Sequence, residues 1–312
     1  MIRQGLLWLS EQQWVFDFAR RNPLARPFAR RFVAGEELDE AIAAARQLAA
    51  RGITTSLDLL GESVSREADA VAACNQYLGM LDRLAATDEG VEVNASVKLT
   101  QMGFDIDEEL CFRNVAAILD RAKAAGGFVR LDMESSAYTQ RTLDFFVDRI
   151  LEPYGAHCGV VIQSCLRRSA ADVERLIGMR ARVRLCKGAY LEPPAVAFPD
   201  KADVDRSYVQ LMERLLDAGN YPAIATHDEK IIEHARRHVQ RRGIGEERFE
   251  FQMLYGVRRD LQDKLRAAGH RMRVYVPYGT QWYPYLMRRL AERPANIAFI
   301  LGNVLREGRG PR

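Results

Sequence analysis

The feature that most constrains the fold of this 312-residue chain is an alternation of short strand-like runs with long amphipathic segments from Gly52 onward. Eight runs are β-branched, aromatic or nearly continuous in apolar residues, as strands covered on both faces should be. They span residues 54–60, 93–99, 128–133, 160–163, 183–186, 223–226, 249–253 and 273–276. Helical patterns lie between them, at 64–86, 110–125, 139–151, 170–178, 203–219, 229–243 and 261–269. Eight such units over about 250 residues predict a (βα)8 barrel.

A doubly wound parallel sheet is the competing α/β architecture. Such a sheet binds dinucleotides through a Gly-x-Gly-x-x-Gly turn between a strand and a helix. The nearest match, Gly243-Ile-Gly245, follows a helix and lacks the third glycine. We therefore favour a TIM barrel over residues 52–312, preceded by a helical segment over residues 1–51 that packs on it. Within that segment, Ser10 and Gln13 form a capping-box pattern, and residues 36–51 have helical spacing.

Composition excludes several classes of protein. With 48% hydrophobic and 28% charged residues the chain is ordinary for a globular protein, and its net charge of 45 − 42 = +3 gives no argument for nucleic acid. The five cysteines include no Cys-x-x-Cys pair, so neither a disulfide framework nor a structural zinc site is indicated. We expect reduced thiols and a cytoplasmic location.

The N-terminal stretch is amphipathic but too short in apolar length to cross a bilayer, which needs roughly 20 residues. Trp8, Trp14 and Phe18 lie near a group of cationic side chains: Arg20, Arg21, Arg26, Arg30 and Arg31. We favour a packed helix with a basic C-terminal end. A peripheral contact with the inner face of the cell membrane is the alternative.

Polar residues occupy the ends of seven of the eight predicted strands, where the active site of a barrel lies. The third strand carries Arg130, Asp132 and Glu134 at alternate positions, which share one face. The other ends supply Lys98, Gln163, Arg184, residues 187–190, residues 226–228, Gln252 and Tyr275. One such lysine or histidine is more often solvated or structural. A convergent ring of charges in an apolar interior indicates a ligand site, because unpartnered buried charge costs several kcal/mol.

The last helical pattern, residues 282–293, places Tyr285, Arg288, Arg289 and Glu292 on one face. That face is either solvated, with an Arg288–Glu292 pair, or turned inward with two guanidinium groups that bind a carboxylate. Adjacent arginines repel each other unless an anion bridges them. The spacing alone leaves both arrangements open.

Six motifs at these positions resemble the proline dehydrogenase family, the flavin-dependent enzymes that begin proline breakdown. The motifs are ASVKLT (95–100), RLDME (130–134), VRLCKGAY (183–190), ATH (225–227), EFQMLYG (250–256) and YLMRRLAE (285–292). The likeness spans roughly residues 36–305. It implies a distorted (βα)8 barrel that holds FAD without a Rossmann domain, in the short bacterial form without an aldehyde dehydrogenase domain.

The resemblance also implies a role for each matching residue. Lys98, Arg288 and Arg289 would bind the carboxylate of L-proline. Its ring would be surrounded by Tyr190, Leu254, Tyr275 and Tyr285, and the Tyr275 hydroxyl would disfavour hydroxyproline. FAD would be held by Met133, Gln163, Arg184, Lys187, Gly188, Ala189, Thr226, His227 and Gln252. The implied catalytic residues are Asp132, Tyr190 and Arg184, with Asp132 ordering the pocket, while Glu292 would pair with an active-site arginine at a gate.

The implied reaction moves a hydride from the ring carbon beside nitrogen to N5 of the flavin, which gives Δ1-pyrroline-5-carboxylate. Positioning would dominate such a reaction, and Arg184 near the flavin would stabilise negative charge on the reduced ring. A membrane quinone would accept the electrons. Two residues depart from the family pattern: Leu191 replaces a common Trp, and Asp228 replaces a common Asn. The first bears on flavin packing, and the second adds negative charge near the flavin or its phosphates.

Three other hypotheses use the same residues. A metal-dependent barrel could take Asp132, Glu134, His227 and Asp228 as ligands of Mg²⁺ or Mn²⁺. A Schiff-base lyase could use Lys98 or Lys187, and would need a lysine of depressed pKa. A binding protein without catalysis is the third. Our favoured interpretation contains FAD and no metal.

Overall fold

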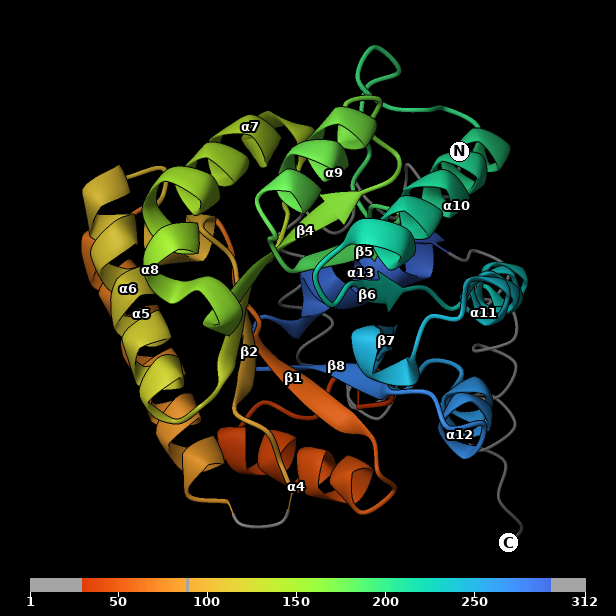
Figure 1. The fold of residues 1–312 in the computed structure, drawn as a ribbon. Helices are drawn as coiled ribbons and strands as arrows, with labels where there is room; N and C mark the ends of the chain where they lie inside the picture. Colours follow the sequence, from red (N-terminus) through yellow and green to blue (C-terminus); the bar gives the residue numbers. More distant parts are fainter. Residues whose placement is uncertain (1–29, 88–89, 293–312) are drawn as a thin grey trace, which may run out of the picture.

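The computed structural model describes residues 30–87 and 90–292, and for residues 288–292 it describes only the backbone. Parallel strands close into a barrel in which each pairs with the next and β8 returns to β1 (Figure 1). The strands are β1 (Thr54–Leu59), β2 (Asn94–Val97), β3 (Phe128–Leu131), β4 (Cys158–Gln163), β5 (Val183–Cys186), β6 (Ala223–Ala225), β7 (Glu250–Leu254) and β8 (Met272–Tyr278). The predicted α/β barrel is confirmed, and each strand overlaps the run predicted for it.

Helices surround the barrel, as Figure 1 shows. They are α5 (Glu67–Ala85), α6 (Glu108–Ala124), α7 (Ser136–Phe145), α8 (Glu152–Tyr154), α9 (Ser169–Gly178), α10 (Lys201–Ala218), α11 (Glu229–Arg242) and α12 (Arg259–Ala267). Residues 146–151 continue α7 as a π-helical segment. The apolar core lies between strands and helices, where Leu57, Val97 and Leu131 are fully buried. This layer buries the outward faces of the strands and leaves their inward faces for the site.

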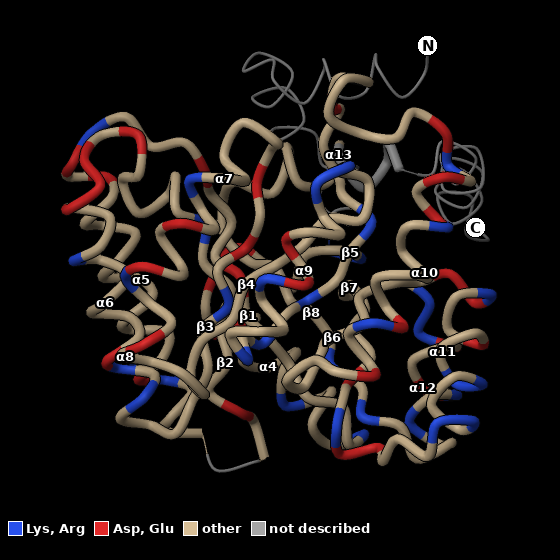
Figure 2. Tube along the Cα trace, turned by 45° about the horizontal axis from the view of Figure 1, so that its top comes forward, with Lys and Arg blue, Asp and Glu red and all other residues tan. Residues whose placement is uncertain are grey.

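Two further helices belong to the ends of the described chain. Helix α4 (Leu38–Ala49) begins with a reciprocal capping box between Glu37 and Glu40, and it packs against β1 and β8. Helix α13 (Trp282–Glu292) follows β8 after the turn 279–281, at the C-terminal end of the barrel (Figure 2). The Ser10–Gln13 cap and the amphipathic stretch with Trp8, Trp14 and Phe18 lie outside the described residues. Among the helices that are described, none is long and apolar enough to span a bilayer.

The interior of the barrel holds several buried charges, most of them in ion pairs, whereas such interiors are usually filled by branched apolar side chains. Three ion pairs bridge neighbouring or facing strands: Arg273–Glu250 at 2.9 Å, Arg184–Asp132 at 2.7 Å and Lys98–Asp58 at 2.8 Å. No side chain in them is more than 12% exposed. Because Arg273 lies near the start of β8 and Lys98 just after the end of β2, the pairs run from the N-terminal to the C-terminal end of the barrel.

The Arg273–Glu250 pair predicts a specific acid sensitivity. Burial opposes the charge on Glu250, but the Arg273 guanidinium outweighs it and lowers the pKa from 4.5 to about 2. The folded state therefore gains stability from this carboxylate above pH 4.5 and loses it as the pH falls towards 2. That difference corresponds to about 3 kcal/mol. We expect Glu250→Gln to lower the free energy of unfolding at pH 7 by about 3 kcal/mol or more, because Arg273 loses a buried partner.

Urea denaturation at pH 7, 4.5 and 3 tests this expectation. The variant should lose less further stability on acidification than the parent does. Glu109→Gln is the matched control, since the Glu109 side chain is 54% exposed in its pair with Arg149. Equal acid sensitivity of parent and Glu250→Gln would contradict the expectation.

Candidate active site

Arg184 on β5 organises the centre of the barrel. Its Nη1 donates to Asp132 Oδ1 at 2.7 Å, its Nε to Gln252 Oε1 at 2.6 Å and its Nη2 to Ser96 Oγ at 3.2 Å. The guanidinium carbon lies 5.2 Å from the centroid of the Tyr275 ring. These groups come from β2, β7, β8 and the end of β3, so one planar cation joins side chains from around the barrel. A lysine could not satisfy all three acceptors at once.

Asp132 and Tyr275 form the second element of this centre. Asp132 follows β3 directly, and its Oδ2 accepts a hydrogen bond from the Tyr275 hydroxyl at 2.8 Å. Burial, together with the carboxylates of Asp132 and Asp58, raises the pKa of Tyr275 well above its usual value. Tyr275 is therefore a neutral hydroxyl donor at physiological pH. Both oxygens of Asp132 are engaged, which fixes the carboxylate between Arg184 and Tyr275.

Lys98 lies beside this centre and pairs with a residue that the sequence analysis missed. Its Nζ donates to Asp58 Oδ1 at 2.8 Å, and the two side chains are 10% and 1% exposed. Burial opposes the ammonium, but the carboxylates of Asp58 and Asp132 outweigh it and raise the pKa of Lys98. A Schiff-base lysine needs a lowered pKa, so the raised pKa of Lys98 does not support that hypothesis there. Asp58 and Ser56 alternate on β1, the one strand to which we had assigned no polar end.

The loop after β5 holds the next set of predicted residues. Lys187 Nζ donates to Asp205 Oδ1 at 2.6 Å and to Asp228 Oδ2 at 3.0 Å. Gly188 has φ of +106°, and a Cβ there would lie 2.5 Å from Cys165 Sγ and 2.9 Å from Gln163 Oε1. Only glycine fits this close approach of loop and strand end. Ala189 and Tyr190 follow in the same loop and are half-buried.

The ends of β4, β6 and β7 supply Gln163, Thr226, His227 and Leu254. The Leu254 backbone N–H donates to His227 Nε2 at 2.9 Å, so the proton of a neutral His227 lies on Nδ1. Thr226 Oγ1 accepts from the backbone of Asp228 at 3.1 Å, and Gln163 Nε2 donates to the backbone carbonyl of Glu134 at 2.7 Å. Met133, which directly follows Asp132 in the sequence, is also buried. The structure thus brings the described members of the predicted site to the same end of the barrel.

Helix α13 is packed rather than solvated in its first turns. The side chains of Trp282, Tyr283, Tyr285, Leu286 and Met287 are all buried, and together they form one broad side of the helix. This burial agrees with an inward position for α13. The predicted contacts of Arg288, Arg289 and Glu292 concern side chains outside the described residues.

The candidate metal ligands do not form one cluster. Asp132 is held by Arg184, while Asp228 is held by Lys187 and caps α11 through the backbone of Lys230. Glu134 accepts from Thr100 Oγ1 at 2.6 Å. Asp132 and Glu134 both lie beyond Leu131, the last residue of β3, and Glu134 bonds to Thr100 whereas Asp132 bonds to Arg184. Within the described ranges, no three His, Cys, Asp or Glu residues could together hold a metal ion.

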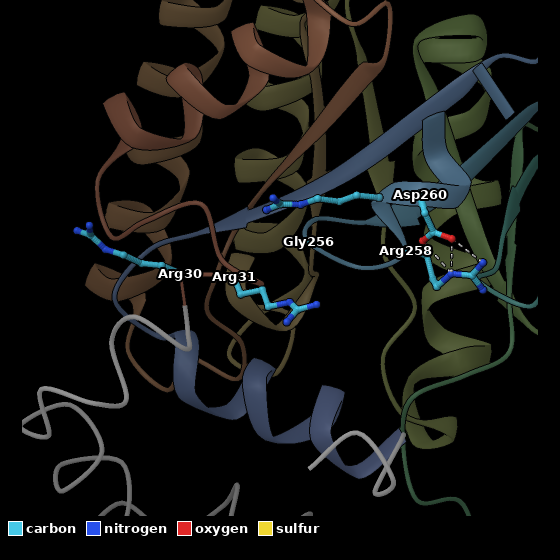
Figure 3. A pocket seen from close by; sticks show the side chains of 6 residues that line it. Arg30, Arg31, Gly256, Arg258 and Asp260 are labelled. Atoms are coloured by element: carbon cyan, nitrogen blue, oxygen red, sulfur yellow. Dashed lines mark hydrogen bonds and ion pairs between the residues drawn. The ribbon is translucent and has the colours of Figure 1, made fainter. Parts of the chain in front are cut away.

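A cavity of about 600 Å³ lies between the segment before α4 and the loop before α12, and no residue of the Arg184 centre lines it. It is lined by Arg30, Arg31, Gly256, Arg258, Arg259 and Asp260 (Figure 3). Its cations do not converge: Figure 3 shows Arg30 and Arg31 pointing apart, and Arg258 donates to Asp260 at 3.0 Å. A Cβ on Gly256 would overlap the backbone carbonyl of Arg31, which explains the glycine. The converging charged groups are instead those around Arg184, near the C-terminal ends of the strands.

The fold and this site define an enzyme of the (βα)8-barrel class, with a cationic, hydrogen-bonded centre at the C-terminal ends of its strands. The proline dehydrogenase family model matches residues 41–301. A proline dehydrogenase of Deinococcus radiodurans is 44% identical over 311 residues and is covered to 98%, as is this chain. Proline dehydrogenase 1 of Bacillus subtilis is 39% identical over 307 residues, which cover 98% of this chain and 100% of that protein. The chain belongs to the proline dehydrogenase family and is an oxidoreductase.

A solved structure shows the same fold. Proline utilization A of Bdellovibrio bacteriovorus, inactivated by N-propargylglycine, superposes with a TM-score of 0.80 at 27% identity over 90% of this chain. The match covers 34% of that longer protein. Our identification of the family from six motifs is confirmed, as is the barrel that it implied.

Proposed function

We propose that this protein catalyses the first step of proline catabolism to glutamate, the oxidation of L-proline to Δ1-pyrroline-5-carboxylate with FAD as hydride acceptor. The observation that carries the proposal is the Arg184–Asp132–Tyr275 centre with Lys98 beside it, at the strand ends of a chain of this family. A cation for the substrate carboxylate and a fixed cation at the barrel centre are what such a reaction requires of a protein.

The residues present fit a flavin. Gly188 lets the loop after β5 lie directly against Cys165 and Gln163 at the end of β4, which keeps residues of both segments together for a cofactor. Around it stand hydrogen-bonding groups of both kinds, from Gln163, Arg184 and Gln252. Bound FAD would supply the atom that accepts the hydride. In this proposal Met133, Gln163, Arg184, Gly188, Ala189 and Gln252, with Lys187, Thr226 and His227, hold it.

The chain's own contribution is charge and orientation. Arg184 is fixed by three acceptors, so it presents positive charge in one direction without reorganising. Tyr275 is fixed by Asp132, and in this proposal its ring forms one wall around the substrate. We propose that Tyr190, Leu254 and Tyr285 complete the wall around the proline ring. Lys98, with Arg288 and Arg289 from α13, would bind the carboxylate, and Glu292 would pair with one of these arginines.

Two parts of the proposal rest on the family resemblance. A quinone would take up the electrons, which requires contact with the membrane that holds it. We propose the basic, aromatic stretch near residues 8–31 as the segment that makes this contact. The N-terminal segment as a whole, residues 1–51, would pack on the barrel. The described contact from Ala34 N to Pro277 O, at 2.9 Å, supports that packing.

Anaerobic reduction by proline tests the proposal. The purified protein should be yellow, L-proline should bleach it without oxygen, and a quinone should restore the colour. Cyclopentanecarboxylate, which has the ring and carboxylate but no amine, should bind without bleaching. A yellow protein that keeps its colour with proline would overturn the proposed reaction.

A further inference from the structure

We propose that Asp58 is the residue that positions Lys98 to bind the substrate carboxylate, a role that rests on the proposed function. Asp58 lies on β1 and Lys98 directly after β2, and Asp58 Oδ1 accepts from Lys98 Nζ at 2.8 Å. The two strands are neighbours, with Asp58 in register with Ser96. The pair is therefore built into the barrel wall rather than formed by chance between flexible surface groups.

A lysine needs such a partner if it is to act as an oriented donor. Its four-carbon side chain is flexible and its ammonium is a point charge with three N–H groups. Within the described part of the chain, Lys98 spends one of these donors, on Asp58. Two N–H groups remain for the oxygens of a ligand. Fixing one donor thus sets the direction of the other two.

The bonding of Asp58 itself argues for a role at Lys98. Its side chain is 1% exposed, yet Oδ2 has no hydrogen-bond partner among the described residues. Burial, with Asp132 as a second carboxylate, raises the pKa of Asp58 although Lys98 opposes this. An incompletely bonded carboxylate in a dry site weakens the fold. For stability alone, apolar residues in place of the whole Asp58–Lys98 pair would serve at least as well, so the pair points to a use of the lysine.

The charge of Lys98 depends on the groups that face it from the surrounding elements. These are Asp58 and Glu62 from β1 and the loop after it, Asp132 and Glu134 from the end of β3, and Tyr275 of β8 close to Asp58. Among these described residues, only Asp58 accepts a hydrogen bond from the Lys98 ammonium. Removing its charge leaves the burial of Lys98 in place and deletes the strongest opposing contribution, so the pKa of Lys98 should fall.

Direct titration of Lys98 tests the inference without substrate. The chain has six lysines, so ¹³C labelling at lysine Cε gives a spectrum simple enough to assign. In the holoenzyme, Lys98 should remain an ammonium above pH 10.5, the ordinary pKa of a lysine. In Asp58→Asn, which keeps shape and a neutral acceptor, Lys98 should titrate at least one pH unit lower than in the parent. Ser56→Ala removes a buried hydroxyl from the same face of β1, and it should leave the pKa of Lys98 unchanged.

Ligand affinity supplies the second measurement. Asp58→Asn should bind cyclopentanecarboxylate about 10- to 100-fold more weakly by calorimetry once Lys98 is neutral, as expected for the loss of a charged donor. The KM for proline should rise in parallel, with kcat changed much less. Unchanged titration of Lys98 in the variant overturns the proposal, and so does a shifted titration with unchanged affinity.

Two outcomes separate this inference from the proposed function. If proline is not oxidised but Lys98 titrates and binds the ring carboxylate as described, the reaction is wrong and the positioning role stands. If Asp58→Asn does not fold, the parent decides: a pKa of Lys98 at or below the ordinary lysine value of 10.5 overturns the proposal.

Discussion

Arg184→Met should lower the free energy of unfolding by about 3–5 kcal/mol, one of the largest effects expected of any single substitution here. The substitution keeps an unbranched apolar stem and deletes the cation. Asp132 would then be a buried carboxylate that keeps, among the described residues, the hydrogen bond from Tyr275, and Gln252 and Ser96 would lose a donor. Equilibrium denaturation in urea at pH 7 measures the loss.

Two further variants show that burial causes the effect. Arg214 makes an equally short pair with Glu174, at 2.7 Å, but the side chains are 49% and 53% exposed. Arg214→Met should leave the denaturation midpoint almost unchanged, because solvent screens such a pair. Adding Asp132→Asn to Arg184→Met should recover part of the lost stability, since no charge is then buried unpaired. A midpoint for Arg184→Met equal to that of Arg214→Met would show that the pair contributes little.

The barrel could be predicted from the sequence because its signals are local. Each strand is a run of β-branched or apolar residues, and each helix has its own apolar stripe, so periodicity finds both without knowing their partners. The same local rule places Arg184, Gln252 and Tyr275 on inward faces. It gives no partner for Asp132 or Glu134, because both lie beyond Leu131, where β3 ends and the two-residue period no longer applies.

The pairing of the inward side chains could not be predicted in the same way. Lys98 and Asp58 are 40 residues apart, and Arg184 and Asp132 are 52 apart. Which side chains meet depends on barrel closure and on the stagger between strands. Asp58 also had no local signal strong enough to stand out, because it lies within an apolar run.

The ion pairs of Lys187 are a second feature that the sequence alone did not predict. The resemblance assigned it to the cofactor, and the structure places it between Asp205 and Asp228. Asp228, which departs from the family pattern, therefore has a physical account. Burial opposes its charge, but the hydrogen bond from Lys187 outweighs it and lowers the pKa of Asp228. The same carboxylate caps α11, so the added charge is paired within the protein.

Gly188→Ala should reduce the flavin content of the purified protein at least tenfold while the chain remains folded. The new Cβ would lie 2.5 Å from Cys165 Sγ and 2.9 Å from Gln163 Oε1, and the backbone has φ of +106°. A non-glycine residue in such a conformation costs about 1–3 kcal/mol. Both strains are relieved by moving the loop after β5 away from the end of β4. That movement separates Gly188 from Gln163, two of the residues that we propose to hold the cofactor.

The absorbance of flavin relative to protein measures the effect, before and after incubation with excess FAD. Gly126→Ala is the matched control: its φ is also positive, at +66°, but a Cβ there would meet nothing within 4 Å. It lies just before β3, at the N-terminal end of the barrel, whereas Gly188 lies at the C-terminal end. It should cost about 1 kcal/mol of stability and leave flavin content unchanged. If both variants lost flavin equally, backbone strain anywhere in the barrel would explain the loss. Full flavin in Gly188→Ala would place the cofactor elsewhere, because the close approach at Gly188 is the feature that this substitution removes.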